Sequence, residues 1–201
     1  DFSNILRTIL RQDPDVILVG EIRDYETAAM ALEAAMTGHL VFSSLHTYSA
    51  LETLVRLHDL QVKPYLLASA LKAVISQQLL PRLSPASREP VPPDAPVVAR
   101  LKELEVLEAD WSGTLYRAKG GKGAGSSAEP GRIAVYEIML ITDRLRDLID
   151  RSATRNELEQ ALDPRYFFSF ARYCRFLLKQ GLVSPEDAEQ IFPKKPMSLP
   201  D

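Results

Sequence analysis

Two residues with catalytic chemistry each follow a short apolar run. Glu21 comes just after the run 16–19, and His46 comes just after the run 40–45. Unbroken apolar runs of this length are typical of strands buried on both faces of a parallel sheet. In open α/β sheets, ligands bind outside the carboxyl ends of the strands. If the two strands are neighbours, the Glu21 carboxylate and the His46 imidazole lie at the same edge of the sheet. Glu21 could then orient or deprotonate a water, and His46 could donate a hydrogen bond to a phosphate oxygen. The alternative for Glu21 is a solvated acid ahead of a helix.

A second histidine, His39, lies seven residues before His46, at the other end of the same expected strand. A strand rises ~3.3 Å per residue, so the two histidines are expected roughly 20 Å apart. His39 is therefore predicted to order the helix-to-strand turn or to face a neighbouring subunit. A two-histidine metal site is not expected, since no third ligand has suitable spacing.

The elements expected along residues 1–83 alternate in type. An amphipathic helix is expected at 2–12 and a strand at 16–19, followed by a helix that Asp24 caps and that stops at Thr37–Gly38. A second strand is expected at 40–45, followed by a helix that begins with a Ser49–Glu52 capping box. A longer helix is expected from Pro64, with a buried apolar face made of Leu67, Ala70, Leu71 and Val74. This order predicts an α/β fold, although two strands are too few for a complete parallel sheet.

The rest of the chain changes character twice. Residues 84–96 contain five prolines and are interpreted as a linker, and the glycine-rich residues 119–131 as a flexible loop. A short helix is expected at 97–108 and a strand at 133–139. The last third is predicted to be helical, and a Thr154–Glu157 capping box begins one helix. A later helix ends at Gly181, and its apolar face is made of Phe167, Phe170, Ala171, Cys174, Leu177 and Leu178. Pro185 stands at the first position of the next helix. On that face Cys174 is predicted to be a buried structural thiol rather than a nucleophile.

Composition limits the function classes. A hydrophobic content of 46% suffices for one core, or for a core and a small satellite. The net charge of -3 lacks the strongly basic balance of nucleic-acid binders, so no nucleic acid is expected as a partner. One cysteine fits a reducing compartment. No apolar run approaches the ~20 residues that span a bilayer, so direct membrane insertion is not expected. A cytoplasmic protein is the default expectation.

Two longer motifs carry a resemblance to a known family. Residues 9–24, ILRQDPDVILVGEIRD, resemble the Walker B segment of the type II secretion and type IV pilus assembly ATPases, and residues 37–47, TGHLVFSSLHT, resemble their histidine box. The resemblance implies a partial RecA-like P-loop NTPase core at 1–83. The remaining expected divisions are a Pro/Gly-rich region at 84–131, a C-terminal helical subdomain at 132–192 and a tail at 193–201.

The resemblance also implies roles for single residues. Glu21 resembles the catalytic Walker B acid, and His46 the histidine that senses the γ-phosphate of ATP. Gly20 stands where many other NTPases place a magnesium-binding aspartate. Gly20, Arg23 and His39 are grouped as residues that support the nucleotide site. The alternative for Arg23 is a surface ion pair with an acidic neighbour, Asp24 or Glu26.

The phosphate-binding signature G-x-x-x-x-G-K-[ST] does not occur in the 201 residues. Residues 119–126, KGGKGAGS, imitate it, but Gly123 follows Lys122 where a serine or threonine must bind Mg²⁺. In the family this loop lies upstream of the Walker B segment. The chain is therefore interpreted as a C-terminal part, with ATP and Mg²⁺ bound only by the full-length protein and no activity expected from this part alone.

Many family members carry a four-cysteine zinc module between the core and the C-terminal helices. Following the resemblance, the four positions here hold Ser84, Ser87, Gly121 and Ala124. Zinc prefers thiolate or imidazole ligands, so no zinc is expected.

The function implied is that of a hexameric motor ATPase, which hydrolyses ATP to drive pilin or pseudopilin assembly. Its expected partners are further copies of itself in the ring and an inner-membrane platform protein, which would hold it at the membrane periphery. Two alternatives stay open: a non-hydrolysing interaction module or degenerate ring subunit, and a DNA-uptake or conjugation motor.

Overall fold

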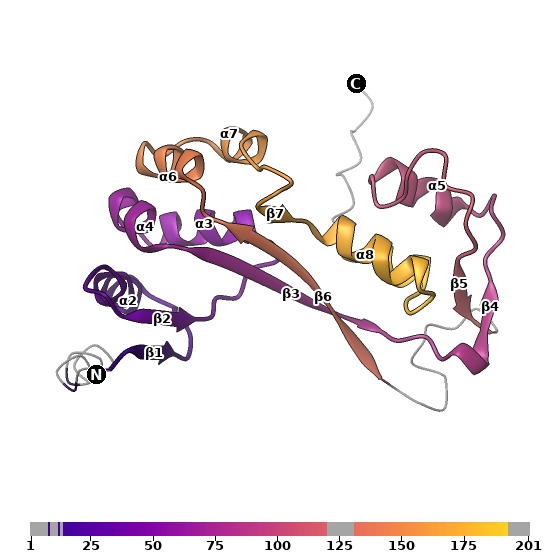
Figure 1. The fold of residues 1–201 in the computed structure, drawn as a ribbon, viewed down its shortest axis with the longest axis horizontal. Coiled ribbons are helices and arrows are strands. Elements are labelled where there is room, and N and C mark those ends of the chain that lie inside the picture. Colours follow the sequence, from indigo (N-terminus) through magenta and orange to yellow (C-terminus); the bar gives the residue numbers. More distant parts are fainter. Residues whose placement is uncertain (1–7, 9–11, 13, 120–130, 193–201) are drawn as a thin grey trace, which may run out of the picture. The chain divides into compact units, whose positions relative to one another are not determined.

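The computed structural model describes residues 8, 12, 14–119 and 131–192 (Figure 1). The chain divides into two compact units, one of Asp1–Ser76 with Glu137–Phe167 and the other of Gln77–Tyr136 with Phe168–Asp201. These units differ from the ranges expected from the sequence, because residues 137–167 pack with the N-terminal part. The helix expected at 2–12, the glycine-rich loop and the tail fall largely or wholly outside the described residues.

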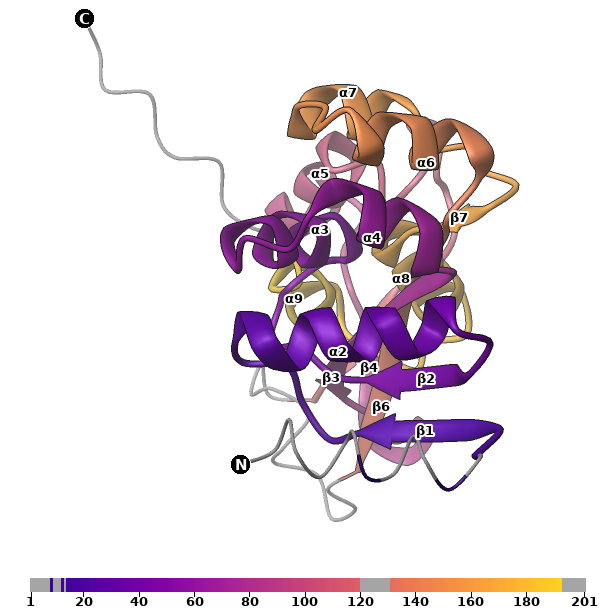
Figure 2. The ribbon, with the colours of Figure 1, turned by 90° about the vertical axis from the view of Figure 1, so that its left-hand side faces the viewer.

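The first unit contains the two strands expected from the apolar runs. Strands β1 (Val16–Val19) and β2 (Leu40–Ser43) pair in parallel, with Val16 opposite Leu40 and Val19 opposite Ser43. Helix α2 (Tyr25–Met36) lies over one face of this pair (Figure 2). The small side chains of Ala31 and Ala34 let it pack closely against Ile17 and Val19. The α/β prediction is confirmed.

The other face of this sheet corrects the prediction that both faces are buried. Val16 is 56% exposed and Leu18 is 79% exposed, and across the pair Leu40 and Phe42 are exposed as well. Successive side chains of a strand point to opposite faces, so only alternate residues reach α2. The described residues do not cover the four apolar side chains on the far face.

The ends of α2 form as the sequence predicts. The Asp24 side chain accepts a hydrogen bond from the Thr27 amide at 2.8 Å, which caps the helix. At the other end the chain passes through Thr37 and Gly38, and Gly38 has a φ of +100° that favours glycine. This turn delivers the chain directly to β2.

The segment after Pro64 differs from its prediction. Helices α3 (Ala50–Asp59) and α4 (Pro64–Ala70) form, but α4 stops at Ala70 and strand β3 (Ala73–Pro81) follows. Val74, predicted on a helical face, lies in β3. The apolar residues fit both periods, and pairing with a distant strand decides between them. Strand β6 (Arg132–Leu140) is that partner, and it confirms the strand predicted at 133–139.

Helices α6 (Asp143–Asp150) and α7 (Arg155–Gln160) complete the first unit. The capping box predicted for Thr154 and Glu157 is present in α7. Leu145 and Leu148 of α6 pack into one core with Leu54 of α3 and Leu66 and Leu67 of α4. This core supports the loop that leads from β2 into α3.

The second unit contains the whole of the predicted linker. Residues 84–96 hold a short 3₁₀ turn (Pro85–Ser87) and strand β4 (Arg88–Pro90), which pairs antiparallel with β5 (Tyr116–Ala118). Helix α5 (Pro96–Glu103) is shorter than the 97–108 predicted. The Arg88 guanidinium donates to the Gly181 carbonyl at 2.7 Å and lies 4.2 Å from the centre of the Tyr116 ring. The segment is therefore more ordered than a linker.

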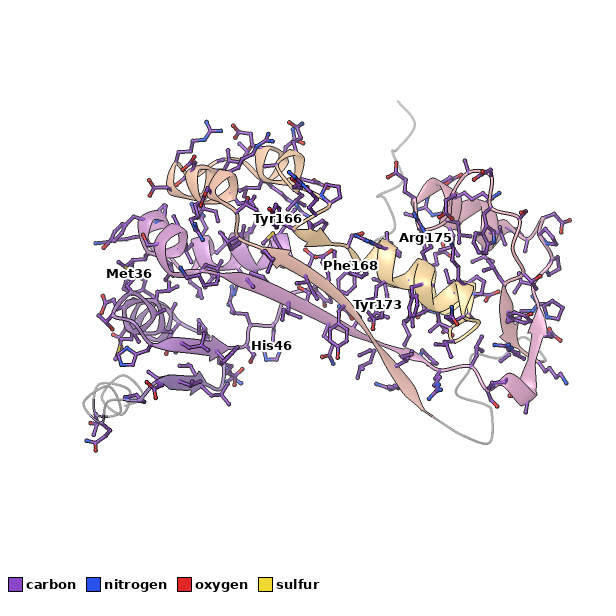
Figure 3. The ribbon with its side chains drawn as sticks, viewed as in Figure 1. Met36, His46, Tyr166, Phe168, Tyr173 and Arg175 are labelled. Atoms are coloured by element: carbon purple, nitrogen blue, oxygen red, sulfur yellow. The ribbon has the colours of Figure 1, made fainter. Side chains whose placement is uncertain are left out.

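The helices of the second unit surround Cys174. Helices α8 (Phe170–Lys179) and α9 (Pro185–Glu189) follow the short strand β7 (Phe167–Phe168). Phe167, predicted to lie on the helical face, precedes the Ser169 cap instead. Cys174 is fully buried, and burial raises its pKa to about 12, as predicted for a structural thiol. In the same unit the Tyr173 ring meets the Phe168 ring edge-on (Figure 3). None of the described helices is long and apolar enough to cross a membrane.

Candidate active site

The carboxyl ends of β1 and β2 are joined by hydrogen bonds beyond the last ladder pair. The Ser44 hydroxyl donates to the Gly20 carbonyl at 2.7 Å, and the Ile22 amide donates to the Ser44 carbonyl at 2.9 Å. These contacts keep the two segments together as far as Ile22 after β1 and Ser44 after β2. The loops carrying Glu21 and His46 therefore begin side by side.

Glu21 and His46 meet at this rim. The His46 Nε2 atom lies 3.2 Å from the Glu21 Oε2 atom, although the residues are 25 apart in sequence. The His46 side chain is 87% exposed and that of Glu21 is 34% exposed, so both are open to a ligand from solvent. Figure 3 shows His46 just past the end of β2. The predicted convergence of an acid and an imidazole on one rim is present in the structure.

Arg23 binds the other oxygen of the same carboxylate. Its guanidinium Nη2 atom lies 2.7 Å from the Glu21 Oε1 atom. The ion pair suggested with Asp24 or Glu26 is thus formed with Glu21 instead, since the Asp24 side chain caps α2. The sequence gives no signal for this choice, because it depends on how the chain turns after β1.

The electrostatic environment keeps Glu21 charged. The hydrogen bond from Arg23 holds the pKa of the Glu21 carboxyl below its ordinary value, partial desolvation opposes this, and His46 adds a smaller lowering. The carboxylate is therefore ionised throughout the neutral pH range. An ionised carboxylate can accept hydrogen bonds from a water and orient it.

His39 lies at the opposite end of β2. Its Nδ1 atom lies 2.9 Å from the Ala34 carbonyl and 3.2 Å from the Thr37 hydroxyl. The ring thus holds the turn between α2 and β2, in line with the turn-ordering role expected from its position. The structure does not bring His39 to the rim of Glu21 and His46.

The loop after His46 is fixed to the start of α3. Glu52 Oε2 accepts from the Tyr48 amide at 2.7 Å, and the Thr47 and Thr53 hydroxyls lie 2.8 Å apart. The Ser49 hydroxyl caps the Glu52 amide at 3.2 Å, so the predicted capping box forms on its serine side. The Glu52 carboxylate binds Tyr48 rather than Ser49, which ties down the loop one residue closer to His46.

One contact to this loop comes from a residue that the sequence reasoning missed. Glu137 in β6 accepts a hydrogen bond from the Ala50 amide at 2.7 Å. Glu137 is only 8% exposed. An acid at an inward position of a mostly apolar strand was the signal available, since acids are rarely buried without a partner.

A comparison with known protein families identifies the family of the chain. Residues 1–190 match the family described as Type II/IV secretion system protein. The chain belongs to this family. The family resemblance drawn from the Walker B and histidine-box segments is thereby confirmed.

The relatives of this secretion-system family member have related names. The chain is 43% identical over 165 residues to the type II secretion system protein E of Klebsiella pneumoniae, and the match covers 82% of this chain and 32% of the relative. It is 39% identical over 187 residues to the type IV pilus assembly ATPase PilB of Thermus thermophilus, covering 92% of this chain and 21% of the relative. The chain thus spans a third or less of the length of these relatives.

Solved structures confirm the fold. The pilus retraction motor PilT with bound ADP matches with a TM-score of 0.64 and 32% identity, over 96% of this chain and 44% of that one. The ATPase DotB of Legionella pneumophila matches with a TM-score of 0.63 at 22% identity, over 95% of this chain and 42% of that one. At this identity the match supports only the fold. The secretion-system family member has the α/β fold of RecA-like P-loop ATPases.

The residues present at the positions of the family's zinc module do not fit a zinc site. Ser84 and Ser87 offer hydroxyls where thiolates are needed, and Ser87 donates its amide to the Ser84 carbonyl within a 3₁₀ turn. The other two positions, Gly121 and Ala124, fall outside the described residues. Within the described part of the chain no three His, Cys, Asp or Glu residues are grouped to hold a metal ion. In this region, β4 and β5 are linked by an ion pair, in which the Arg117 Nε atom lies 3.0 Å from the Glu89 Oε1 atom.

We therefore expect the purified chain to contain no stoichiometric zinc. Elemental analysis after purification without chelator measures this directly. A chelator should leave the thermal unfolding temperature unchanged, because metal-dependent folds lose stability when the metal is removed. One bound zinc per chain, or a chelator-dependent loss of stability, would contradict the prediction.

Proposed function

We propose that the chain is the Walker B and histidine-box part of a hexameric motor ATPase, which powers type IV pilus assembly or type II protein secretion by ATP hydrolysis. The observation that carries this proposal is the 3.2 Å contact between His46 and Glu21 at the carboxyl ends of two parallel strands. Such ends are where α/β sheets bind ligands. Family membership supplies the reaction class, and the pair supplies groups suited to it.

The two side chains have complementary roles in this proposal. Phosphoryl transfer is catalysed mainly by positioning and by electrostatic stabilisation. The ionised Glu21 orients the attacking water or accepts its proton. The exposed imidazole of His46 donates a hydrogen bond to an oxygen of the γ-phosphate. The 3.2 Å contact with His46 uses one acceptor position of the Glu21 carboxylate, and its remaining lone pairs can accept hydrogen bonds from a water.

The phosphate cradle and the Mg²⁺ site belong, in this proposal, to polypeptide beyond these 201 residues. The sequence lacks the G-x-x-x-x-G-K-[ST] signature, whose lysine and hydroxyl bind the phosphates and Mg²⁺. When bound there, Mg²⁺ would neutralise negative charge on the phosphate groups. The apolar face of β1 and β2 that the described residues leave exposed supports the idea that further polypeptide packs on it. Gly20 and Arg23 remain the proposed supporting residues at this rim, whereas His39 supports the turn between α2 and β2.

The proposed partners follow from the same family. We place the protein in a six-membered ring of identical subunits, docked on an inner-membrane platform protein. That arrangement makes it cytoplasmic and peripheral to the membrane. Neither DNA nor RNA is needed for this activity.

Mixing experiments test the proposal. The 201-residue chain alone should hydrolyse ATP no faster than its Glu21→Gln variant, because neither can hold the phosphates. Adding the upstream P-loop portion of the same protein should restore hydrolysis to the unchanged chain and not to the variant. Hydrolysis by the chain alone would contradict the proposal.

Two other results would favour the alternatives. Assembly with the P-loop portion without any hydrolysis favours a degenerate ring subunit or interaction module. Hydrolysis that requires single-stranded or duplex DNA favours a DNA-uptake or conjugation motor.

A further inference from the structure

Glu137 is a buried carboxylate that belongs to neither strand end of the candidate site. It lies in the middle of β6, where its Oε1 atom accepts a hydrogen bond from the Ala50 amide, 87 residues away in sequence. Burying a charge without polar contacts is strongly unfavourable, so a buried acid in a strand depends on the contacts it makes. The contact to Ala50 links β6 to the start of α3.

Ala50 is the first residue of α3, and its amide has no partner within the helix. The residue is fully buried, so water does not reach this amide readily. A carboxylate is a favourable acceptor there, since the N-terminus of a helix carries partial positive charge and charge-assisted hydrogen bonds are strong. Glu137 therefore fixes where α3 begins.

The start of α3 in turn sets the position of His46, which lies four residues earlier. The His46 side chain is 87% exposed, so packing around the ring does little to hold it. Its placement depends on the backbone of the loop, which is tied at Ser44 on one side and at the start of α3 on the other. The contacts of Glu52 with Tyr48 and of Thr53 with Thr47 lie within α3 and its own loop. They move with α3, whereas Glu137 anchors α3 to another part of the unit.

We infer that Glu137 is a positioning residue, which holds the N-terminus of α3 so that His46 reaches the same rim as Glu21. This inference depends on the proposed function of the Glu21–His46 pair. Loss of the Glu137 carboxylate leaves a buried amide without its acceptor, and the loop relaxes to satisfy it. A shift of about 1 Å in a group that positions the reaction is enough to lower turnover on the order of a hundredfold.

The test uses the full-length ATPase with its P-loop, and compares four variants. Glu137→Ala should lower kcat about 10- to 100-fold while the KM for ATP stays the same, because the phosphate cradle is untouched. Glu137→Gln keeps an oxygen that accepts from Ala50, and should recover most of that loss. Asp143→Ala removes an exposed carboxylate from the first turn of α6 and should change nothing. His46→Ala reports whether the histidine matters at all.

Hydrogen exchange of the same full-length proteins adds a readout that does not depend on activity. Peptides covering residues 44–50 should exchange faster in Glu137→Ala than in the unchanged protein, and Glu137→Gln should restore protection. If Glu137→Ala fails to assemble, the Glu137→Gln variant tests the inference. The inference requires that the activity of Glu137→Gln stays near that of the unchanged protein.

The outcomes separate the inference from the proposed function. Full activity of His46→Ala would overturn the role proposed for the histidine. Impaired His46→Ala with normal kcat in Glu137→Ala would overturn the positioning role alone. Lost kcat in Glu137→Ala without faster exchange at residues 44–50 would also overturn it, because the loop would not have moved.

Discussion

If the full-length protein hydrolyses ATP as proposed, replacing its Glu21 by glutamine is expected to lower kcat by about 10²- to 10⁴-fold, the range that a positioned acid or base contributes. Glutamine has nearly the same shape and can still accept a hydrogen bond from Arg23, so the rim should keep its geometry. It carries no charge and cannot take a proton from water. The KM for ATP should change little, because the proposed phosphate cradle lies elsewhere. Steady-state hydrolysis rates over a range of ATP concentrations give both constants.

Asp24→Asn is the matched control for this substitution. It removes a carboxylate three residues away, but asparagine caps a helix as well as aspartate does. Activity should therefore remain near that of the unchanged protein. A loss of kcat below tenfold in Glu21→Gln, or an equal loss in both variants, would show that Glu21 does not act on the water.

The pH dependence has a definite direction. The pKa of Glu21 is held below its ordinary value, chiefly by the hydrogen bond from Arg23, so the charged form is already complete at mildly acidic pH. Its contribution is present above that pKa and is lost only as the pH falls through it. A fall in kcat between pH 8 and 6 must therefore come from another group.

Local sequence signals predicted a large part of the fold and of the candidate site. The two apolar runs became β1 and β2, and Asp24, Gly38 and Thr154 cap or end helices as their side chains and backbone require. These features depend on residues within about four positions of each other, so the sequence states them directly. The meeting of Glu21 and His46 followed because parallel neighbouring strands bring their carboxyl ends to one edge.

Features that depend on distant residues were missed. Residues 73–81 form a strand because β6 pairs with them, and no local pattern separates that strand from a continued helix. The partner of Arg23 depends on the turn after β1. Glu137 meets Ala50 only once β6 and α3 are packed in one unit. For β3 and for Glu137 a tertiary contact chose between possibilities that the local sequence leaves equal, whereas the Arg23 pair with Glu21, two residues away, was decided by the backbone turn after β1.

Leu178→Ala is expected to destabilise the second unit by ~2–5 kcal/mol, the range for removing a buried leucine side chain. Leu178 is fully buried in α8, in a core shared with Leu101, Val135 and Leu177. The adjoining core residue Cys174 reports the opening of this unit, because it is the single cysteine of the chain. Its pKa, raised to about 12 by burial, keeps the thiol protonated in the closed state. Thiol labelling at mildly alkaline pH must then await opening.

The rate of Cys174 labelling should rise roughly thirtyfold to a few thousandfold in Leu178→Ala, since every 1.4 kcal/mol is a factor of ten. Phe176→Ala provides the control, because it also shortens a large apolar side chain of α8 but one that is 54% exposed. It should change the rate far less, by the amount expected for a surface position with one edge-on contact to Tyr173. Equal rates in the two variants would mean that α8 does not pack as the structure has it. The labelling rate of Cys174 reports only the opening of the second unit. The comparison of the two variants therefore does not depend on whether the two units unfold together.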